Sequence, residues 1–457
     1  MKKIIFAALM CIITVLAGGI TLEESIELAR RNNKELLMAR EEVLKAEQTY
    51  YDVRGYLLPQ VMLQGGYTLK KTWLPDGLMP PRVDFSSELD APTENEEYLA
   101  GALDAVVNSM IPSSPRNEGS LAMQVQLQQV LFLGGKLING IRAVDRYRSI
   151  QRLMEQLVEQ NVVLGTTELF YQCLLAQKLQ QVQSDGLATA NRHLQRVEAF
   201  YREGQVSEFD LLRARLEVAK LKPQVFQAEN TYKLALTAFR RQIGAADENI
   251  IPDAEFVLPP AMIITLEDAI REGIDNRIEL ELADINTQIM QIRWNAEKGN
   301  YLPNVALQAD YSIYTAADEF GIERKDFGSR YTIGIGIQIP LFTGFSNTSK
   351  RKYAKHGYLK ARLQQQDSEE LIAMQIKQNY QSWQHALENY EVQSENIRLA
   401  ERSLQLAQVR FDNQMGIQLE VFDAQIMLSA LKLQYYQSIF EVISAERNLQ
   451  KSIGIRL

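Results

Sequence analysis

The sequence predicts an α+β membrane protein whose chain combines four lipid-facing β-strands with very long coiled-coil helices. Three observations lead to this prediction: a secretory leader, segments that alternate apolar with small or polar residues, and a proline-free helical stretch from Lys136 to Arg202. The pattern of strands followed by long helices occurs twice within the 457 residues. A tandem duplication is therefore the organising feature of the chain.

The first 19 residues are expected to be a signal peptide, because Lys2 and Lys3 precede an apolar run that ends in small residues. No later run of about 18 apolar residues predicts a membrane-spanning helix. Without the leader, 47 of the 49 basic residues remain against 57 acidic ones, and this acidic balance argues against nucleic acid as a partner. One cysteine, Cys173, is left, so we expect no disulfide within the chain.

Two ungapped alignments within the chain define the duplication. Residues 21–68 match residues 265–312 with 15 identities in 48 positions, and residues 121–244 match residues 331–454. The offset falls from 244 to 210 between the two alignments, which places 34 extra residues in the first copy's loop. Self-similarity of this kind outranks the other signals in the sequence.

We expect the first repeat over residues 20–250 and the second, with its shorter loop, over residues 251–457. Each begins with a helix, because Thr21 and Thr265 are N-cap candidates that have an acidic residue three positions later. Each continues into two strands and a long helical hairpin.

The four strand candidates alternate apolar with small or polar residues, as in a barrel wall with lipid outside and water inside. They begin near Val61, Leu121, Val305 and Tyr331. In the last of them, Ile335 and Ile337 are expected to face lipid, whereas Gln338 faces the lumen. Alternation alone would favour a half-buried sheet of a soluble protein, but the leader, the glutamine-rich second face and the adjoining helices favour a barrel. Four strands cannot enclose a lumen, so the chain is expected to oligomerise.

The loop between residues 69 and 120 of the first copy is long, proline-rich and acidic. Such a composition is typical of a loop in water rather than of a packed core. A short helix is expected within it, around Glu96–Met110.

Each repeat is expected to end in a helical hairpin. Apolar residues from Leu187 to Tyr201 are spaced by three and four, which is the spacing of a coiled-coil seam, and the spacing recurs 210 positions later. Gly204 ends the first long helix and Ser207 caps the returning one. A helix over residues 136–202 would measure about 100 Å. The returning helix and the helix before the first strand, placed end to end, would be about as long, as a tube with an even wall requires.

The sequence shows no pattern typical of catalysis, a cofactor or a metal. His193, His356 and His385 are scattered without a cysteine or carboxylate at metal-ligand spacing, so we expect all three on the solvated surface. With no nucleophile and base paired, the chain is not expected to be an enzyme. Two other classes stay open at this point: a periplasmic coiled-coil scaffold, which would be soluble, and a polysaccharide-acting enzyme, which would need a carboxylate pair in a cleft.

Several motifs resemble those of one family. The junction at residues 340–344 reads Pro-Leu-Phe-Thr-Gly, and residues 202–214 read Arg-Glu-Gly-Gln-Val-Ser-Glu-Phe-Asp-Leu-Leu-Arg-Ala. Together with the duplication, they resemble the TolC family of bacterial outer-membrane export ducts over essentially the whole mature chain. The second copy departs from the family's turn, because Gln414 replaces its glycine and Ile417 its serine.

The resemblance implies a homotrimer with a twelve-stranded barrel in outer-membrane lipid and a twelve-helix tunnel through the periplasm. Such a duct exports passively, within a tripartite efflux or type I secretion system, and docks to a periplasmic adaptor protein that is bound to an inner-membrane pump. The adaptor would contact the hairpin tips, at Gly204, Gln205, Val206, Ser207, Met415 and Gly416. Whether drugs or proteins are exported is left open, because the pump selects the cargo.

The resemblance also implies an acidic gate. Glu420 and Asp423 match the family's acidic entrance pair, and three copies would gather six carboxylates around one axis. Asp210 matches the acid that ties neighbouring coils together, although its spacing from Ser207 fits helix capping equally well. Its aromatic and basic partners would fall at Phe411 and Gly416, which have no hydroxyl and no side chain, so we expect a weaker closed state.

Overall fold

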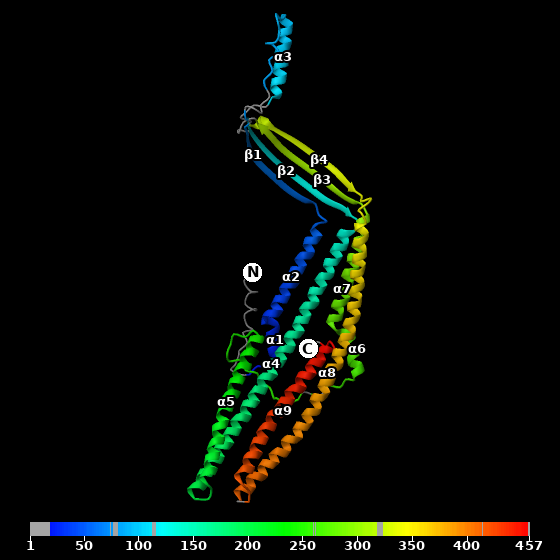
Figure 1. The fold of residues 1–457 in the computed structure, drawn as a ribbon. Helices are drawn as coiled ribbons and strands as arrows, with labels where there is room; N and C mark the ends of the chain where they lie inside the picture. The colour runs from blue at the N-terminus through cyan, green and yellow to red at the C-terminus, as the bar shows by residue number, and fades with distance from the viewer. Residues whose placement is uncertain are drawn as a thin grey trace, which may run out of the picture. The chain divides into compact units, whose positions relative to one another are not determined.

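The computed structural model describes residues 19–73, 75, 81–111, 116–258, 260, 262–317, 323–413 and 415–455. The expected signal peptide, apart from Gly19, and Gln414 lie outside the described residues. The elements follow in this order (Figure 1): α1 Leu22–Asn32, α2 Lys34–Gly55, β1 Gln60–Thr72, α3 Glu94–Met110, β2 Arg116–Leu133, α4 Lys136–Arg202, α5 Glu208–Gln242, α6 Leu266–Asn276, α7 Ile278–Lys298, β3 Asn304–Ala317, β4 Phe327–Gln338, α8 Ser346–Asp412 and α9 Gln418–Ser452. The predicted combination of four strands with long helices is confirmed.

The chain forms two compact units, and each draws on both halves of the sequence. A helical unit contains the residues up to 49, residues 143–291 and the residues from 355 onward, while a strand unit contains residues 50–142 and 292–354. The division into repeats at residue 250 follows the sequence alignment rather than these units, and it stays a prediction.

The strand unit contains one antiparallel sheet in the order β1-β2-β3-β4 (Figure 1). Its registers align the predicted faces across all four strands. One row joins Leu63, Val125, Tyr311 and Tyr331, and the next joins Gln64, Gln124, Ser312 and Arg330. Apolar and polar side chains therefore lie on opposite faces of the sheet. β4 ends at Gln338, two residues before Pro340, which cannot donate to a ladder.

The helix predicted in the long loop of the first copy is confirmed as α3. A capping box between Thr93 and Glu96 begins it. Farther along, the Asn108 side chain exchanges two hydrogen bonds with the backbone of Val83, at 2.9 and 2.7 Å. The Asp104 carboxylate accepts a hydrogen bond from the backbone N–H of Phe85 at 2.7 Å. These bonds hold the segment that contains Val83 and Phe85 against α3.

The two predicted hairpins are α4 with α5 and α8 with α9 (Figure 1). They belong to the helical unit except for the first residues of α4 and α8, which belong to the strand unit. The outgoing helices α4 and α8 have 67 residues each and the returning helices α5 and α9 have 35 each. Among the described helices, none combines the length and the apolar character needed to cross a membrane.

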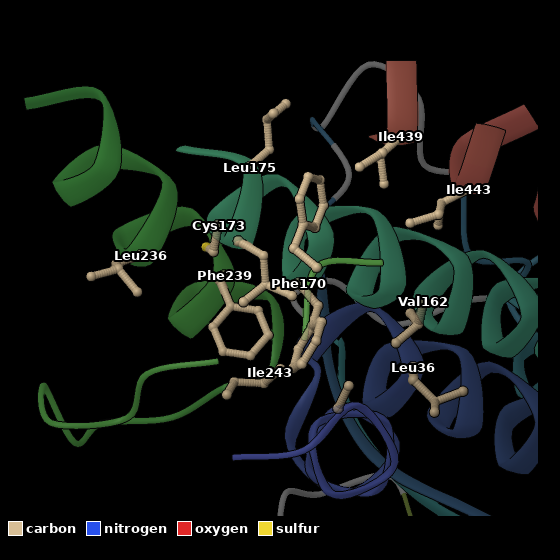
Figure 2. Packing of buried hydrophobic residues seen from close by; sticks show 13 residues of the cluster. Leu36, Val162, Phe170, Cys173, Leu175, Leu236, Phe239, Ile243, Ile439 and Ile443 are labelled. Atoms are coloured by element: carbon tan, nitrogen blue, oxygen red, sulfur yellow. The ribbon is translucent and has the colours of Figure 1, made fainter. Parts of the chain in front are cut away.

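The largest core cluster of this unit lies where α1 and α2 meet the hairpins, and Figure 2 shows its packing. Phe170 of α4 and Phe239 of α5 are fully buried and meet edge to face at 5.9 Å between ring centroids. Replacing either ring with alanine in such a core costs about 3–5 kcal/mol. Cys173 is a buried free thiol in the same cluster, and burial raises its pKa to about 12, which marks it as a core residue rather than a nucleophile.

The two hairpins end in the same way. Gly244 has φ of +64° and lies against Asn32 at the end of α1, so close that a Cβ there would stand 2.7 Å from that residue's Cβ. Gly454, with φ of +77°, lies against Asn276 at the end of α6 with the same separation. Only glycine combines this backbone conformation with this approach, which explains the glycine at both positions.

Candidate functional site at the hairpin tips

The first tip is a tight turn built around Gly204. The N–H of Gly204 donates to the carbonyl of Tyr201 at 3.0 Å, and that of Gln205 to the carbonyl of Phe200 at 2.9 Å. These two bonds form a Schellman motif, which requires the positive φ of +75° observed at Gly204. A Cβ on this glycine would meet nothing within 4 Å, so the turn is open to an approaching partner.

The returning helix begins with a capping box between Ser207 and Asp210. The Ser207 hydroxyl donates to the Asp210 carboxylate at 2.6 Å, and the Asp210 N–H donates back to that hydroxyl at 3.2 Å. Val206 is half-buried and packs beside a small cluster that contains Val197, Leu211 and Phe422. Gly204, Gln205 and Ser207 are exposed. Asp210 therefore has the capping role that its spacing predicts.

The second tip is built differently. The Met415 side chain is exposed, and its N–H donates to the carbonyl of Arg410 at 2.8 Å. A Cβ on Gly416 would stand 2.9 Å from the Glu420 carboxylate and 3.1 Å from the Arg410 Cβ. Ile417 begins α9 without a side-chain cap, as its replacement of serine predicts. The turn thus depends on the small size of Gly416 rather than on a capping hydroxyl.

The two candidate gate acids have different surroundings. Glu420 is exposed and lies 3.7 Å from the guanidinium of Arg410 on the other side of the turn. Asp423 is exposed one turn later on α9. They share one side of the helix, as their spacing requires. Sequence reasoning missed the Arg410 contact because it is made across the turn.

The expectation for His193 was wrong, because its side chain is buried and only 8% of the residue is exposed. It stands 5.3 Å from the ring of Phe411 on α8 and 4.8 Å from the ring of Phe422 on α9. Gly186, Ala190 and Val197 are also buried, at spacings of four and three, so position 193 lies on the buried stripe of α4. The spacing of these residues in the sequence could therefore have predicted that His193 is buried. His356 and His385 are exposed, as expected.

An ion pair next to His193 also connects the two hairpins. The Arg196 guanidinium of α4 donates to the Asp412 carboxylate of α8 at 2.9 Å. Both side chains are about half exposed, so the pair contributes at most about 1 kcal/mol. The two residues are 216 positions apart in the sequence, so no local pattern could have predicted the contact. In the ranges that the structure describes, no cluster of three His, Cys, Asp or Glu residues could hold a metal.

The chain is similar to known proteins over nearly its whole length. The family model described as Outer membrane efflux protein matches residues 25–245 and 269–455. Outer membrane efflux protein BepC of Brucella suis is 22% identical over 337 residues, which are 72% of this chain and 71% of BepC. Outer membrane protein TolC of Vibrio cholerae is 20% identical over 469 residues, which are 99% of this chain and 96% of the relative.

Solved structures share the fold at lower identity. The outer membrane protein VceC from Vibrio cholerae aligns with a TM-score of 0.70 at 15% identity, covering 95% of this chain and 96% of VceC. The CmeC outer membrane channel of Campylobacter jejuni aligns with a TM-score of 0.72 at 14% identity, covering 95% of this chain and 86% of CmeC. At such identities the likeness concerns the arrangement of strands and helices.

Proposed function

The chain belongs to the outer membrane efflux protein family, and on that premise we propose that it is the exit duct of a tripartite efflux or type I secretion system. The family places the protein in the outer membrane as an efflux channel, which is a conduit and not an enzyme. The homotrimer, the periplasmic tunnel, the adaptor and the inner-membrane pump are the further parts of the proposal.

The open sheet is the observation that most favours association with further copies of the chain. In the described part of the chain, β1 pairs with β2 and β4 pairs with β3, so one edge of each outer strand has no ladder. Unpaired edges of 13 and 12 residues are unstable in a membrane, where every backbone group needs a partner. Pairing β1 of one copy with β4 of the next would satisfy both edges and, with three copies, close twelve strands around a lumen.

The apolar face of the sheet favours lipid as its surroundings. Ile333, Ile335 and Ile337 are 73%, 64% and 65% exposed. Val61 and Leu63 of β1 are exposed to the same degree, at 64% and 66%. An apolar face of this size, in a family that lies in the outer membrane, fits a lipid-facing wall with the glutamine-rich face toward the lumen.

The first tip supports docking to an adaptor. It combines a rigid turn with exposed backbone at Gly204 and Gln205, and it carries a half-buried Val206 that fixes the turn to the hairpin. The second tip adds the exposed side chains of Met415 and Ile417. Exposed apolar residues beside a rigid turn are suited to recognition by a partner protein.

We expect Gly204→Trp to abolish export while the trimer still assembles. A tryptophan would strain the positive φ of this position and place a large ring over the turn. Export in cells and crosslinking to the co-purified adaptor are the measurements. Gly204→Asn is the matched control, because asparagine tolerates this conformation and its side chain is small, so it should keep most of the export. Normal export by the tryptophan variant would remove the first tip from the docking surface.

A further inference from the structure

The helix α3 in the long loop of the first copy carries an apolar stripe that the described part of the chain leaves uncovered. Leu99, Leu103, Val106 and Met110 are each between 46% and 77% exposed. They lie four, three and four positions apart, so they form one line along the helix. This is the spacing of the a and d positions of a coiled coil, which pack against another helix.

A different side of α3 is occupied by the loop that precedes it. The Asp104 carboxylate accepts from the backbone N–H of Phe85 and from the hydroxyl of Ser86, both at 2.7 Å. Asn108, one turn later, exchanges two hydrogen bonds with the backbone of Val83. The loop therefore fixes the helix without covering its apolar stripe.

The charges of α3 favour another copy of the helix over lipid as the partner of this stripe. The helix contains four acidic residues and no lysine or arginine, whereas helices that lie on a membrane surface carry basic residues on their polar face. Beside the stripe stand the small, uncharged side chains of Ala100, Ala102 and Ser109. Glu96 falls on the line of the stripe at its first turn, but its carboxylate caps the helix at Thr93, so the apolar part begins at Leu99.

The proposed barrel would bring three copies of α3 close together. The helix lies between β1 and β2, and the ladder of these strands ends at Thr72 and Arg116, the end from which the segment with α3 leaves the sheet. Twelve strands about 4.8 Å apart and tilted by about 40° close a barrel about 12 Å in radius, so the three segments leave one rim about 20 Å apart. The chain on either side of α3 is long enough to bring the helices to about 8–10 Å, the separation of packed helices.

We propose that the α3 helices of three copies pack along this stripe into a short parallel coiled coil at that rim. The proposal rests on the trimer of the proposed function and adds a contact between the copies outside the barrel. Because the barrel already holds the three helices near one axis, a seam of four apolar residues from each copy is enough to join them. The rim is at the other end of the strands from α2 and α4, so the coiled coil would stand across the exit of the duct.

Cysteine crosslinking in proteoliposomes tests the seam with two matched variants. Leu103→Cys places a thiol on the stripe, and Gly101→Cys places one on the opposite side of the same turn, where a Cβ meets nothing within 4 Å. Oxidation should join two chains about tenfold or more faster at position 103 than at position 101, because a disulfide needs the two backbones close together. The native Cys173 does not interfere, because it is buried and its pKa is raised to about 12. Equal rates at the two positions would overturn the seam.

A second pair of variants tests whether the apolar stripe holds the helices together. In the Leu103→Cys protein, Val106→Glu would place three carboxylates in the seam and should slow the crosslinking by about tenfold or more. Ala105→Glu introduces the same charge at an exposed position beside the stripe and should leave the rate unchanged. Crosslinking that Val106→Glu does not slow would contradict the proposal.

Two further measurements separate this proposal from its rivals. Native mass spectrometry of the reduced Leu103→Cys protein gives the number of chains. A trimer whose cysteines do not crosslink would overturn the coiled coil and leave the proposed function intact, whereas a particle without three chains would contradict both. A bimane fluorophore on Leu103→Cys should be insensitive to doxyl-labelled lipid, and quenching by that lipid would show that the stripe lies against the membrane instead.

Discussion

At the scale of one residue, Asp210 shows that contacts between sequence neighbours can be predicted from the sequence more reliably than contacts between residues far apart in it. Its carboxylate and N–H are both engaged with Ser207, and the three-residue spacing predicted that engagement. His193 shows the opposite case. Its environment is made by Phe411 and Phe422, more than 200 residues away in the sequence. Its place on the buried stripe was visible in the sequence, but its two aromatic neighbours were not.

The acidic pair gives the first prediction at this scale. In planar bilayers the protein should be cation-selective and blocked from the periplasmic side by multivalent cations, because three copies of Glu420 and Asp423 would surround one axis. Replacing both with alanine should weaken the block by about tenfold or more, since each lost carboxylate removes an attraction of about 1 kcal/mol per unit charge even in water.

Arg410 offers a control in the opposite direction. Its guanidinium lies 3.7 Å from Glu420 and partly neutralises it. Arg410→Ala should therefore tighten the block. If the double alanine variant is blocked as tightly as the parent, the two acids serve only the start of α9 and the gate lies elsewhere.

At the scale of the element, strands and helices were predictable where local chemistry defines them. Caps at Thr21, Thr265 and Ser207 begin helices as expected, and Gly204 ends one. The alternation of the strands needs only the two-residue period of a pleat. The register between strands was not predictable, because it depends on pairings such as Val125 with Tyr311 over a distance of nearly 200 residues.

The facing of β4 gives a prediction for one element. Ile335→Arg or Ile337→Arg should block insertion into the membrane, at a cost of about 2–4 kcal/mol near the bilayer midplane. Heat-modifiable migration of outer-membrane extracts measures the folded fraction.

Two substitutions on the other face serve as controls. Gln338→Glu should be tolerated. Gln308→Arg is the sharper control, because it introduces the same arginine on the other face of the sheet. Gln308 lies on β3 opposite Gly334, which is next to Ile333 on β4. Equal tolerance of all these variants would refute the assigned faces.

At the scale of the whole molecule, the duplication predicted more than any single motif. It accounts for the paired 67-residue helices, the paired 35-residue helices and the two equivalent glycine contacts at Gly244 and Gly454. The two compact units were not predictable from it, since each combines segments from both halves of the chain. Contacts between hairpins, such as Arg196 with Asp412, arise only in that combined arrangement.

The central claim is that three chains close one barrel in the outer membrane, and the mass of the intact particle tests it most directly. Native mass spectrometry of the detergent-extracted protein should give three times the mass of one mature chain. The free edges of β1 and β4 need partners in neighbouring copies, and the family resemblance implies three copies. A stable monomer recovered from a detergent-free periplasmic extract would contradict the account.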